Sequence, residues 1–510
     1  MIPASNYMTI HKYITVQNNE TMDFRTIPSL EYKEFLETNV LFHKDVHNHC
    51  VNYFGFHSGG KLKLICCIAN DSKSRIKLTC TEIESVTSNV FPSMTAQNLA
   101  FNMFEREVSE IFGIKYSDHP WLKPVRYPFD RFDKSAQISN YPFYKMESDE
   151  LHEVGVGPIH AGIIEPGHFR FICKGEQILH LEIQLGYQHR GIERLFLEKN
   201  NLLQRVILSE SIAGDTTVGH SSAFANNWES LCGYEPDEEL QFIRTISLEL
   251  ERIAIHTGDL SAICGDVAYQ LGSSVFSRLR TPIINFFQAW CGNRLAKGLI
   301  RPAENNYIFT SELRTSLLKI LDDFEPDFNE MIHKLFHNPG CLLRFEKTGV
   351  VSYDQALNIG AVGMTAKASG LNRDIRSSHP FCLYKNIEHH PIIKHHGDVF
   401  SRTQIRREEI LQSITYIRSI LEKIPPHHQR KEIFLKPKEN AITVSLVEGW
   451  RGEICHCAVT NELGELFKYK VKDPSFHNWL ALALAVRRNE ISDFPICNKS
   501  FNLSYSGFDL

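Results

Sequence analysis

Four short stretches of the sequence concentrate side chains that can transfer protons or bind a small ligand. They span residues 157–170, 189–193, 368–376 and 472–479, and each combines histidine, arginine or acidic residues with glycine or proline. Packed beside a cavity, such groups perturb one another's pKa, as proton-transfer sites require. The sequence contains no G-x-x-x-x-G-K-[ST], no G-x-S-x-G and no H-E-x-x-H motif, so the common catalytic signatures do not explain these stretches.

Each candidate has a structural and a chemical interpretation. His168 follows a Pro-Gly dipeptide and is therefore expected on a turn, where it is either a hydrogen-bonded loop residue or a proton donor. The other charged candidates suit either an internal ion-pair network or a proton relay: His189, Arg190, Glu193, Arg373, Asp374 and Arg376.

The elements that must position these stretches begin with an α/β unit near the N-terminus. Residues 61–69 and 75–82 alternate apolar and polar side chains, as strands do, and turn-forming residues at 70–74 connect them into a hairpin. From 93 to 112 the apolar residues follow a helical period instead, and Gly113 ends the predicted helix.

The second part of the chain is predicted to be mainly helical. It opens with a hairpin formed by residues 169–173 and 178–183. Pro236, followed by three acidic residues, marks a helix start, because anions there oppose the helix dipole. A second long helix covers residues 410–424 and stops at the two prolines that follow.

We therefore predict an α+β protein with two domains. An N-terminal α/β domain covers residues 1–135, a Pro- and aromatic-rich linker covers 136–152, and a helix-rich domain with small β-sheets at its ends covers 153–510. Limited proteolysis is expected to cut the linker first and to separate two independently folded units.

Composition narrows the class of protein. The 510 residues are 43% hydrophobic and 23% charged, which excludes a mostly disordered chain. The net charge of -5 gives no electrostatic footprint for nucleic acid. No apolar stretch approaches the roughly 20 residues that span a bilayer, and the N-terminus does not resemble a secretory signal. The 13 cysteines include no C-x-x-C pair, so buried thiols in a reducing compartment are expected.

The order of four motifs points to a family. They are G-P-x-H at 157–160, E-P-G-H-F-R at 165–170, H-R-G-x-E at 189–193 and A-S-G-x-x-R-D-x-R at 368–376. With them, residues 153–510 resemble the large subunit of membrane-bound (group 4) nickel–iron hydrogenases and the 49-kDa subunit of respiratory complex I. Residues 1–130 are similar to the 30-kDa subunit of complex I, through 104–115 and the His119-Pro120 pair. The fused order is that of formate-hydrogenlyase-type hydrogenases.

The resemblance implies where a metal centre would be held. In the hydrogenases two Cys-x-x-Cys pairs bind nickel and iron, because soft thiolates suit such a centre. Counted between His189 and His220, the first pair falls on Ala213 and Thr216 here. The second belongs to an Asp-Pro-Cys-x-x-Cys motif, and its two positions fall on Ser475 and Asn478. No thiolate remains at these positions, so the resemblance predicts a chain without a nickel–iron centre.

Complex I uses the corresponding cavity for the headgroup of a quinone. A tyrosine and a histidine hydrogen-bond the quinone carbonyls there, and the tyrosine position coincides with Ala213 in this sequence. The histidine lies on the loop between the first two strands of the domain, so His168 or His160 is its counterpart. Glu165 resembles the hydrogenase glutamate that passes protons to the metal.

The function implied by the resemblance is that of a large subunit in a membrane-associated, ion-translocating oxidoreductase. It would pass electrons from a 4Fe-4S cluster in a small partner subunit to a quinone or similar acceptor, with no cofactor bound by this chain itself. Antiporter-like and other membrane subunits are expected partners, and the chain is expected to lie peripherally on the cytoplasmic face of the cell membrane. Two alternatives stay open: a non-catalytic scaffold with a vestigial site, and an active hydrogenase with substitute ligands.

The predicted site residues fall into two groups. Those expected to act on protons or substrate are His168, Glu165, His189, Arg190, Glu193, His220, Arg373, Asp374 and Arg376; those expected to bind the cofactor are His160, Ala213, Thr216, Ser475 and Asn478. Five segments are expected to meet around one pocket, with His168 as the best-placed hydrogen-bond donor: residues 160–168, 189–193, 213–216, 373–376 and 475–478. An open cavity lined by His168 and Arg376 would favour the enzyme, and a collapsed one the scaffold.

Overall fold

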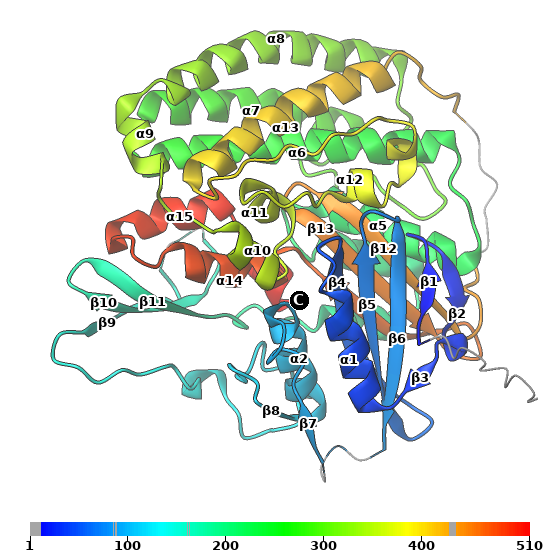
Figure 1. Cartoon of the computed structure of the whole chain (residues 1–510). Helices are drawn as coiled ribbons and strands as arrows, with labels where there is room; N and C mark the ends of the chain where they lie inside the picture. Colours follow the sequence, from blue (N-terminus) through cyan, green and yellow to red (C-terminus); the bar gives the residue numbers. More distant parts are fainter. Residues whose placement is uncertain (1–11, 85, 87–88, 161, 163, 428–434) are drawn as a thin grey trace, which may run out of the picture.

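The structure of the chain is a computed structural model (Figure 1), which describes residues 12–84, 86, 89–160, 162, 164–427 and 435–510. Long helices form a layer at the top of the view in Figure 1, and small β-sheets lie below them. The predicted α+β class is therefore confirmed.

A five-stranded sheet forms the N-terminal part. Its antiparallel order is β1 (Ile14–Val16), β6 (Arg75–Ile83), β5 (Lys61–Asn70) and β4 (Asn48–Ser58), and β3 (Ser29–Leu30) runs parallel to β6. The predicted hairpin is β5–β6, with Asn70 opposite Arg75. A short parallel pair joins β7 (Val90–Pro92) to β8 (Lys115–Ser117).

Two helices accompany this sheet, α1 (Tyr32–Phe42) and α2 (Asn102–Phe112). Helix α2 starts later than predicted, because a 3₁₀ turn at Leu99–Phe101 precedes it. It ends where predicted, at Gly113, whose φ of 76° lies in the left-handed region that glycine adopts without a Cβ clash.

The second part opens with a three-stranded antiparallel sheet of β9 (His152–Val156), β10 (His168–Lys174) and β11 (Gln177–Gln184). The predicted hairpin is β10–β11, in which Phe169 lies opposite Ile183. The G-P-x-H motif lies in the loop between β9 and β10, and the E-P-G-H-F-R motif begins in that loop and ends in β10.

The long helices are α6 (Glu238–Asp266), α7 (Gln270–Cys291), α8 (Ser311–Phe336) and α13 (Val399–Ile420). Helix α6 begins as predicted, because Asp237 caps it by accepting a hydrogen bond from the Leu240 N–H. The described residues also form ten shorter α-helices in the second part: α3 (Ile192–Glu198), α4 (Leu202–Glu210), α5 (Thr217–Cys232), α9 (Pro339–Phe345), α10 (Tyr353–Asn358), α11 (Gly363–Ala368), α12 (Ile375–Ser378), α14 (Ser475–Ala485), α15 (Phe494–Phe501) and α16 (Tyr505–Asp509). In the part of the chain that the structure describes, no helix has the length and apolarity to cross a membrane.

A four-stranded sheet connects the two ends of the chain. Its order is β14 (Leu466–Lys472), β13 (Gly452–Thr460), β12 (Ala441–Gly449) and β2 (Thr21–Asp23), so an N-terminal strand completes a C-terminal sheet. Met22 lies opposite Ile442 in this pairing. The β12–β13 turn points toward α6 and carries Trp450 and Arg451 between its strands.

Both predicted domains contribute to the same hydrophobic cores. One core packs Phe54 and Ile65 of the N-terminal sheet with Ile253 of α6 and Leu446 of β12. Another packs residues of α2 with residues of α14. The two parts therefore form one packed body, contrary to the expected pair of independent units, because burying the outer faces of the N-terminal sheet and α2 requires partners from the second part. The position of the linker at 136–152 stays a prediction.

Candidate functional site

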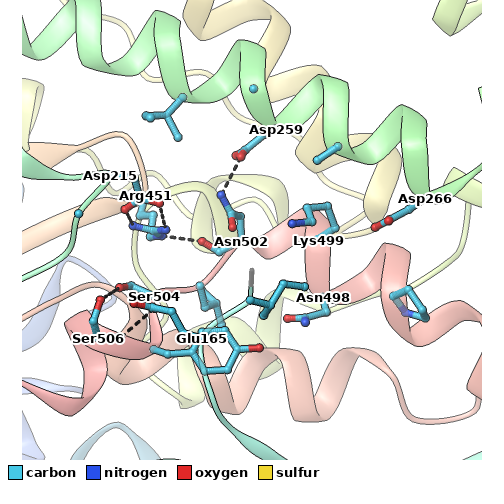
Figure 2. A pocket seen from close by; sticks show the side chains of 18 of the residues that line it. Glu165, Asp215, Asp259, Asp266, Arg451, Asn498, Lys499, Asn502, Ser504 and Ser506 are labelled. Carbon is cyan, nitrogen blue, oxygen red and sulfur yellow. Dashed lines mark hydrogen bonds and ion pairs between the residues drawn. The ribbon is translucent and has the colours of Figure 1, made fainter. Parts of the chain in front are cut away.

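A cavity of about 710 Å³ opens where α6, α7, α15 and α16 meet the loop that connects β9 to β10. Figure 2 shows its charged and polar side chains converging from these separate elements. The polar lining consists of His160, Glu165, Asp215, Asp259, Asp266, Arg280, Arg451, Asn498, Lys499, Asn502, Ser504, Tyr505 and Ser506. Its apolar wall includes Val156, Ile164, Phe169, Phe494, Pro495 and Leu503.

Arg451 is a buried cation in the lining of this pocket. Its guanidinium forms a bidentate ion pair with Asp215, with N–O distances of 2.7 and 2.5 Å, and also donates to Thr216 Oγ1 at 2.9 Å and to the Asn502 carbonyl. The Arg451 side chain is 3% exposed and that of Asp215 is 36% exposed. Burial lowers the pKa of Arg451, but the Asp215 carboxylate more than compensates and raises it, so the guanidinium stays charged.

Secondary structure holds both partners of this ion pair in place. Arg451 sits in the tight β12–β13 turn, and Trp450 beside it donates from Nε1 to the Asp215 carbonyl at 2.8 Å. Asp215 lies in the short connection between α4 and α5, one residue before the N-cap of α5. These contacts bring residues 215 and 451 together.

Helix α6 supplies the rear wall. Asp259 accepts a hydrogen bond from Asn502 Nδ2 at 2.7 Å (Figure 2). It also forms an ion pair with Arg406 at 2.9 Å. Glu251, two helical turns earlier, accepts from the Val218 N–H at the start of α5. Burial raises the pKa of Glu251 to about 8, so this carboxyl group is largely protonated at neutral pH.

The C-terminal segment forms the floor. Ser504 caps α16 by accepting from the Gly507 N–H, and its own N–H donates to Ser475 Oγ at 2.9 Å. Glu165 reaches across from the β9–β10 loop and accepts the Ser506 N–H at 3.2 Å (Figure 2). Loop and floor are therefore connected directly through the predicted proton-passing glutamate.

The structure brings several predicted residues to this pocket. His160 and Glu165 line it, and Ala213 and Thr216 flank the lining residues Gly214 and Asp215. Both flanking residues are buried, and Thr216 meets the pocket through Arg451.

Two other predicted positions lie behind the floor. Ser475 Oγ accepts a hydrogen bond from the Ser504 N–H, and Asn478 donates to the Val362 carbonyl at 3.1 Å instead of facing the cavity. His220 also lies behind it, where its Nε2 is 3.0 Å from Asp473 Oδ2 and its Nδ1 is 3.1 Å from His456.

His168 lies outside the pocket lining, contrary to our expectation. It is the first residue of β10 and not part of the loop, and its side chain packs on Phe143 with ring centroids 5.1 Å apart. Its Nδ1 lies 3.2 Å from the Gly157 carbonyl. Strand pairing turns His168 away from the cavity, and the loop histidine that does line it is His160.

The H-R-G-x-E motif lines a different cavity, of about 520 Å³. Glu193 pairs there with Lys470 at 2.8 Å; burial would raise its pKa, but Lys470 and Lys468 hold it at about 2. The His189 ring lies beside the Asp509 carbonyl, with Nδ1 2.7 Å from that oxygen. Arg190 donates to the carbonyls of Ser211 and Ser506, and thereby braces the pocket floor from outside.

The residues of the A-S-G-x-x-R-D-x-R motif lie in a third place, inside the protein. Asp374 pairs with Arg376 at 2.8 Å and with Lys367 at 3.2 Å, and Arg376 also reaches Glu249 at 3.3 Å. Arg373 donates to the Ala361 carbonyl at 2.9 Å. Side chains fill the space around this cluster, so the expected convergence of the five segments around one pocket is wrong.

Several pocket residues were missed from the sequence. Arg451 carries a recognisable signal, a Trp-Arg-Gly at a tight turn between two alternating segments. Ser504 and Gly507 have the same i, i+3 spacing as Cys-x-x-Cys, and Ser504 lines the pocket together with Gly214 and Asp215. In the sequence, the proline after Asp473 favours Ser475 as a counterpart of the second cysteine pair. In the structure, residues 504–507 are the better counterpart, because Ser504 lines the pocket with Asp215 and Ser475 does not.

The donor chemistry around the pocket is oxygen and nitrogen rather than sulfur. All 13 cysteines are free, and those of the described residues lie elsewhere in the fold, mostly buried. Within the described ranges, no group of three or more histidine, cysteine or acidic side chains is arranged to hold a metal ion.

Comparison with known proteins identifies two family profiles along the chain. The profile of the respiratory-chain NADH dehydrogenase 30 Kd subunit matches residues 31–145, and that of the 49 Kd subunit matches residues 266–443. A relative spanning both parts is hydrogenase-4 component G of Escherichia coli, 28% identical over 439 residues, which cover 83% of this chain and 76% of the relative.

Two further relatives cover a smaller share of the chain. One subunit of the NADH-quinone oxidoreductase of Dehalococcoides mccartyi is 30% identical over 333 residues, which cover 64% of this chain and 90% of the relative. The alpha subunit of the membrane-bound hydrogenase of Pyrococcus furiosus is 25% identical over 370 residues, which cover 69% of this chain and 85% of the relative.

Proposed function

Because the chain belongs to the family of respiratory-chain NADH dehydrogenase 30-kDa and 49-kDa subunits and hydrogenase-4-like large subunits, we propose that it is the large subunit of a related oxidoreductase complex. It passes electrons from a 4Fe-4S cluster in a small partner subunit to a quinone or similar acceptor. The acceptor binds in the pocket beside Arg451.

The observation that carries this proposal is the pocket at the vacated metal positions. Its volume of about 710 Å³ falls within the range of small-molecule sites. One wall is aromatic and aliphatic, which suits a flat ring, and the other offers hydrogen-bonding groups, which suit carbonyl oxygens. A collapsed scaffold would leave no such space.

The residues at the vacated positions do not fit a nickel–iron centre. Ala213 has no donor atom, Thr216 accepts a hydrogen bond from Arg451, and neither 475–478 nor 504–507 contains a thiol. The fixed guanidinium beside Thr216 would also repel a metal cation. We therefore propose that the electrons go directly to the organic acceptor, without a nickel–iron step.

The proposed setting is a membrane complex. The relatives are named as part of a membrane-bound hydrogenase, a hydrogenase-4 component and part of a quinone oxidoreductase, which supports a peripheral position beside membrane subunits. We place the chain on the cytoplasmic face, with the small iron–sulfur subunit and antiporter-like subunits as partners.

Turnover of the assembled complex tests the proposal. Reduction of a water-soluble ubiquinone analogue, with reduced methyl viologen as donor, should depend on Arg451. Arg451→Met should lower turnover about ten-fold or more, because hydrogen bonds to charged groups contribute about 1.5–3 kcal/mol. Arg278→Met, at an exposed surface ion pair, is the matched control and should leave turnover unchanged. Metal analysis finding about one nickel per chain, or hydrogen evolution, would contradict the proposal.

A structural scaffold is the second candidate, and one observation favours it. Arg451 already joins Asp215, Thr216 and Asn502 into a closed network, as a group with a purely structural role would. Under this alternative the wild-type complex shows no quinone-dependent turnover, and Arg451→Met instead loosens association of the partner subunits.

A further inference from the structure

A separate cavity, of about 330 Å³, lies where α2, β11 and α14 meet residues 120–125. It shares no lining residue with the pocket at Arg451. Helix α2 and residues 120–125 belong to the first part of the chain, and β11 and α14 belong to the second. Because elements of both parts form its walls, a molecule in this cavity would contact both.

The inner wall of this cavity is apolar. Leu480, Ala483 and Leu484 line it from α14, and their i, i+3, i+4 spacing places them on one face of the helix. Met103 and Trp121 line it from the first part of the chain. An apolar cavity of about 150 Å³ binds benzene. At about 330 Å³, this cavity therefore has room for a single aliphatic chain of about twelve carbons.

Two arginines give the cavity an excess of positive charge. Arg106 donates from Nε to the Lys123 carbonyl at 2.8 Å and from Nη2 to the Pro124 carbonyl at 2.9 Å. Arg487 follows the C-terminal end of α14 and is exposed. Among the described residues neither arginine forms an ion pair, whereas Glu182, the acidic residue of the lining, is paired with Lys123 at 2.6 Å. An anion in the cavity would therefore be attracted.

The ionisation of His180, another lining residue, reflects the same charge excess. Its ring lies beside that of Trp121, with the ring centroids 5.9 Å apart. Burial lowers the pKa of His180, and Arg487 lowers it further. Glu182 opposes this shift in pKa, and Lys123 adds to it. The imidazole is therefore neutral at pH 7, and the positive charge of the lining comes from the arginines.

We propose that this cavity binds a single-chain amphiphile with a carboxylate head, of the fatty-acid class. The chain packs against Met103, Leu480 and Leu484, and the carboxylate accepts hydrogen bonds from the guanidinium of Arg487. Arg106 contributes charge rather than this contact, because two of its nitrogens already donate to backbone carbonyls. The site is separate from the acceptor pocket, so this proposal goes beyond the proposed function and does not depend on it.

The size and charge of the cavity select this class of ligand. A diacyl phospholipid carries two chains, whereas about 330 Å³ has room for only one chain of about twelve carbons. A neutral alcohol or hydrocarbon would leave the positive charge of Arg106 and Arg487 without a partner. A cationic amphiphile would be repelled by both arginines.

A series of chain lengths tests the apolar part of the site. The assembled complex, held in phosphatidylcholine nanodiscs, is titrated calorimetrically with straight-chain carboxylates from hexanoate to hexadecanoate, and empty nanodiscs give the blank. Affinity should rise about three-fold to four-fold per added methylene and level off beyond about twelve carbons, where the cavity is full. A rise that continues to hexadecanoate would indicate adsorption to an open surface and contradict the proposal.

The lipid of the nanodisc separates a free fatty acid from a membrane lipid as the ligand. In phosphatidylglycerol nanodiscs, decanoate should bind as tightly as in phosphatidylcholine nanodiscs, after each blank is subtracted. Weaker binding in phosphatidylglycerol would mean that an anionic lipid occupies the site, and would overturn the assignment to a single-chain ligand.

Variants test the contact to the carboxylate. Arg487→Met should weaken decanoate binding about five-fold, the upper value for an ion pair at the surface, and leave the binding of the neutral decanol unchanged. Arg488→Met, at the adjacent exposed arginine that does not line the cavity, is the matched control and should bind decanoate as the wild type does. Leu484→Trp, at a half-buried position, should fill the cavity and weaken both probes.

Two results would overturn the proposal. Equal losses in Arg487→Met and Arg488→Met would reduce the effect to the net charge of this face. A wild-type complex that does not bind decanoate would remove the site altogether and leave the proposed function in place, because the acceptor pocket lies elsewhere.

Discussion

The pocket around Arg451 and the buried cluster around Asp374 are both rich in charge, yet they differ in how those charges are satisfied. In the cluster, Asp374, Arg376, Lys367 and Glu409 face one another, and each is buried. In the pocket, Arg451 and Asp215 are paired, but two buried atoms of lining residues, His160 Nε2 and Arg280 Nε, make no hydrogen bond. Charge density alone therefore does not identify a ligand site; unsatisfied groups beside a cavity do.

Under the proposed function, this difference separates the motif residues that would serve ligand binding from those that stabilise the fold. A fully paired buried cluster gains little from a ligand and loses much from any substitution, because each partner left behind is an uncompensated charge. A pocket with unsatisfied donors tolerates substitution structurally and responds through binding. The predictions below test this contrast from the largest expected effect to the smallest.

The largest effect is expected in the buried cluster. Arg376→Met removes the partner of Asp374 and Glu249 from the protein interior. The free energy of unfolding should fall by about 3–5 kcal/mol, as measured by urea denaturation. Arg278→Met removes an exposed partner of Asp327 and should change it little. Equal stability of the two variants would contradict the stabilising role of the buried cluster.

A pH dependence is expected where the N-terminal sheet meets β13. His49 is buried between Asp71 and Glu453, with His379 on the far side of Asp71 and Lys472 on the far side of Glu453. Burial would lower the pKa of His49, but the two carboxylates raise it to about 8.

The sign of this dependence follows from the raised pKa. Because the folded value of about 8 exceeds the unfolded value near 6.5, protonated His49 contributes about 2 kcal/mol below pH 6.5, and this contribution is lost as the pH rises through 8. The stability difference between wild type and His49→Gln should shrink over the same interval. A difference that stays constant from pH 6 to 9 would rule out this linkage.

A smaller loss of stability is expected at the pocket. Asp215→Asn keeps the shape of the side chain but removes the charge that pairs with Arg451. Since Asp215 is 36% exposed, solvent can replace part of the interaction, and the free energy of unfolding should fall by only about 1 kcal/mol. Quinone reduction, measured on the same preparation, should fall more steeply than stability. A loss of stability as large as that of Arg376→Met would make the pocket a structural cluster as well.

The smallest effect is expected from cutting the linker at 136–152. Residues 145–150 are exposed, so a protease should cut there early. The β2–β12 pairing and the shared cores hold the two fragments together. They should co-elute in size-exclusion chromatography under native conditions and separate only in denaturant. Fragments that separate without denaturant would restore the picture of two independent domains.

Local elements could be predicted because their signals are local. Gly113 ends α2, Asp237 caps α6, and alternating residues form β5 and β6 as expected. The pairing of β2 with β12 could not be predicted, since its residues lie more than 400 positions apart and three-residue strands carry little pattern.

The site was predicted in part for a similar reason. His160 and Glu165, which the motifs singled out, line the pocket, but spacing could not separate 475–478 from 504–507, which have the same i, i+3 arrangement. The sequence predicted His168 on the loop, but β10 begins at this residue, and strand pairing turns its ring away from the pocket. The position of Arg451 at the pocket could not be predicted, because it depends on the tight turn between β12 and β13, which forms only in the folded sheet.

Photoaffinity labelling with an azido-quinone tests the central assignment most directly. The assembled complex is irradiated with the probe, digested, and the labelled peptides are identified by mass spectrometry, with excess unlabelled quinone as competitor. Competed labels should fall on residues 156–169 and 494–506, which line the pocket. Competed labels on 363–378, in the buried charge cluster, or an absence of competed labelling on this chain would contradict the account.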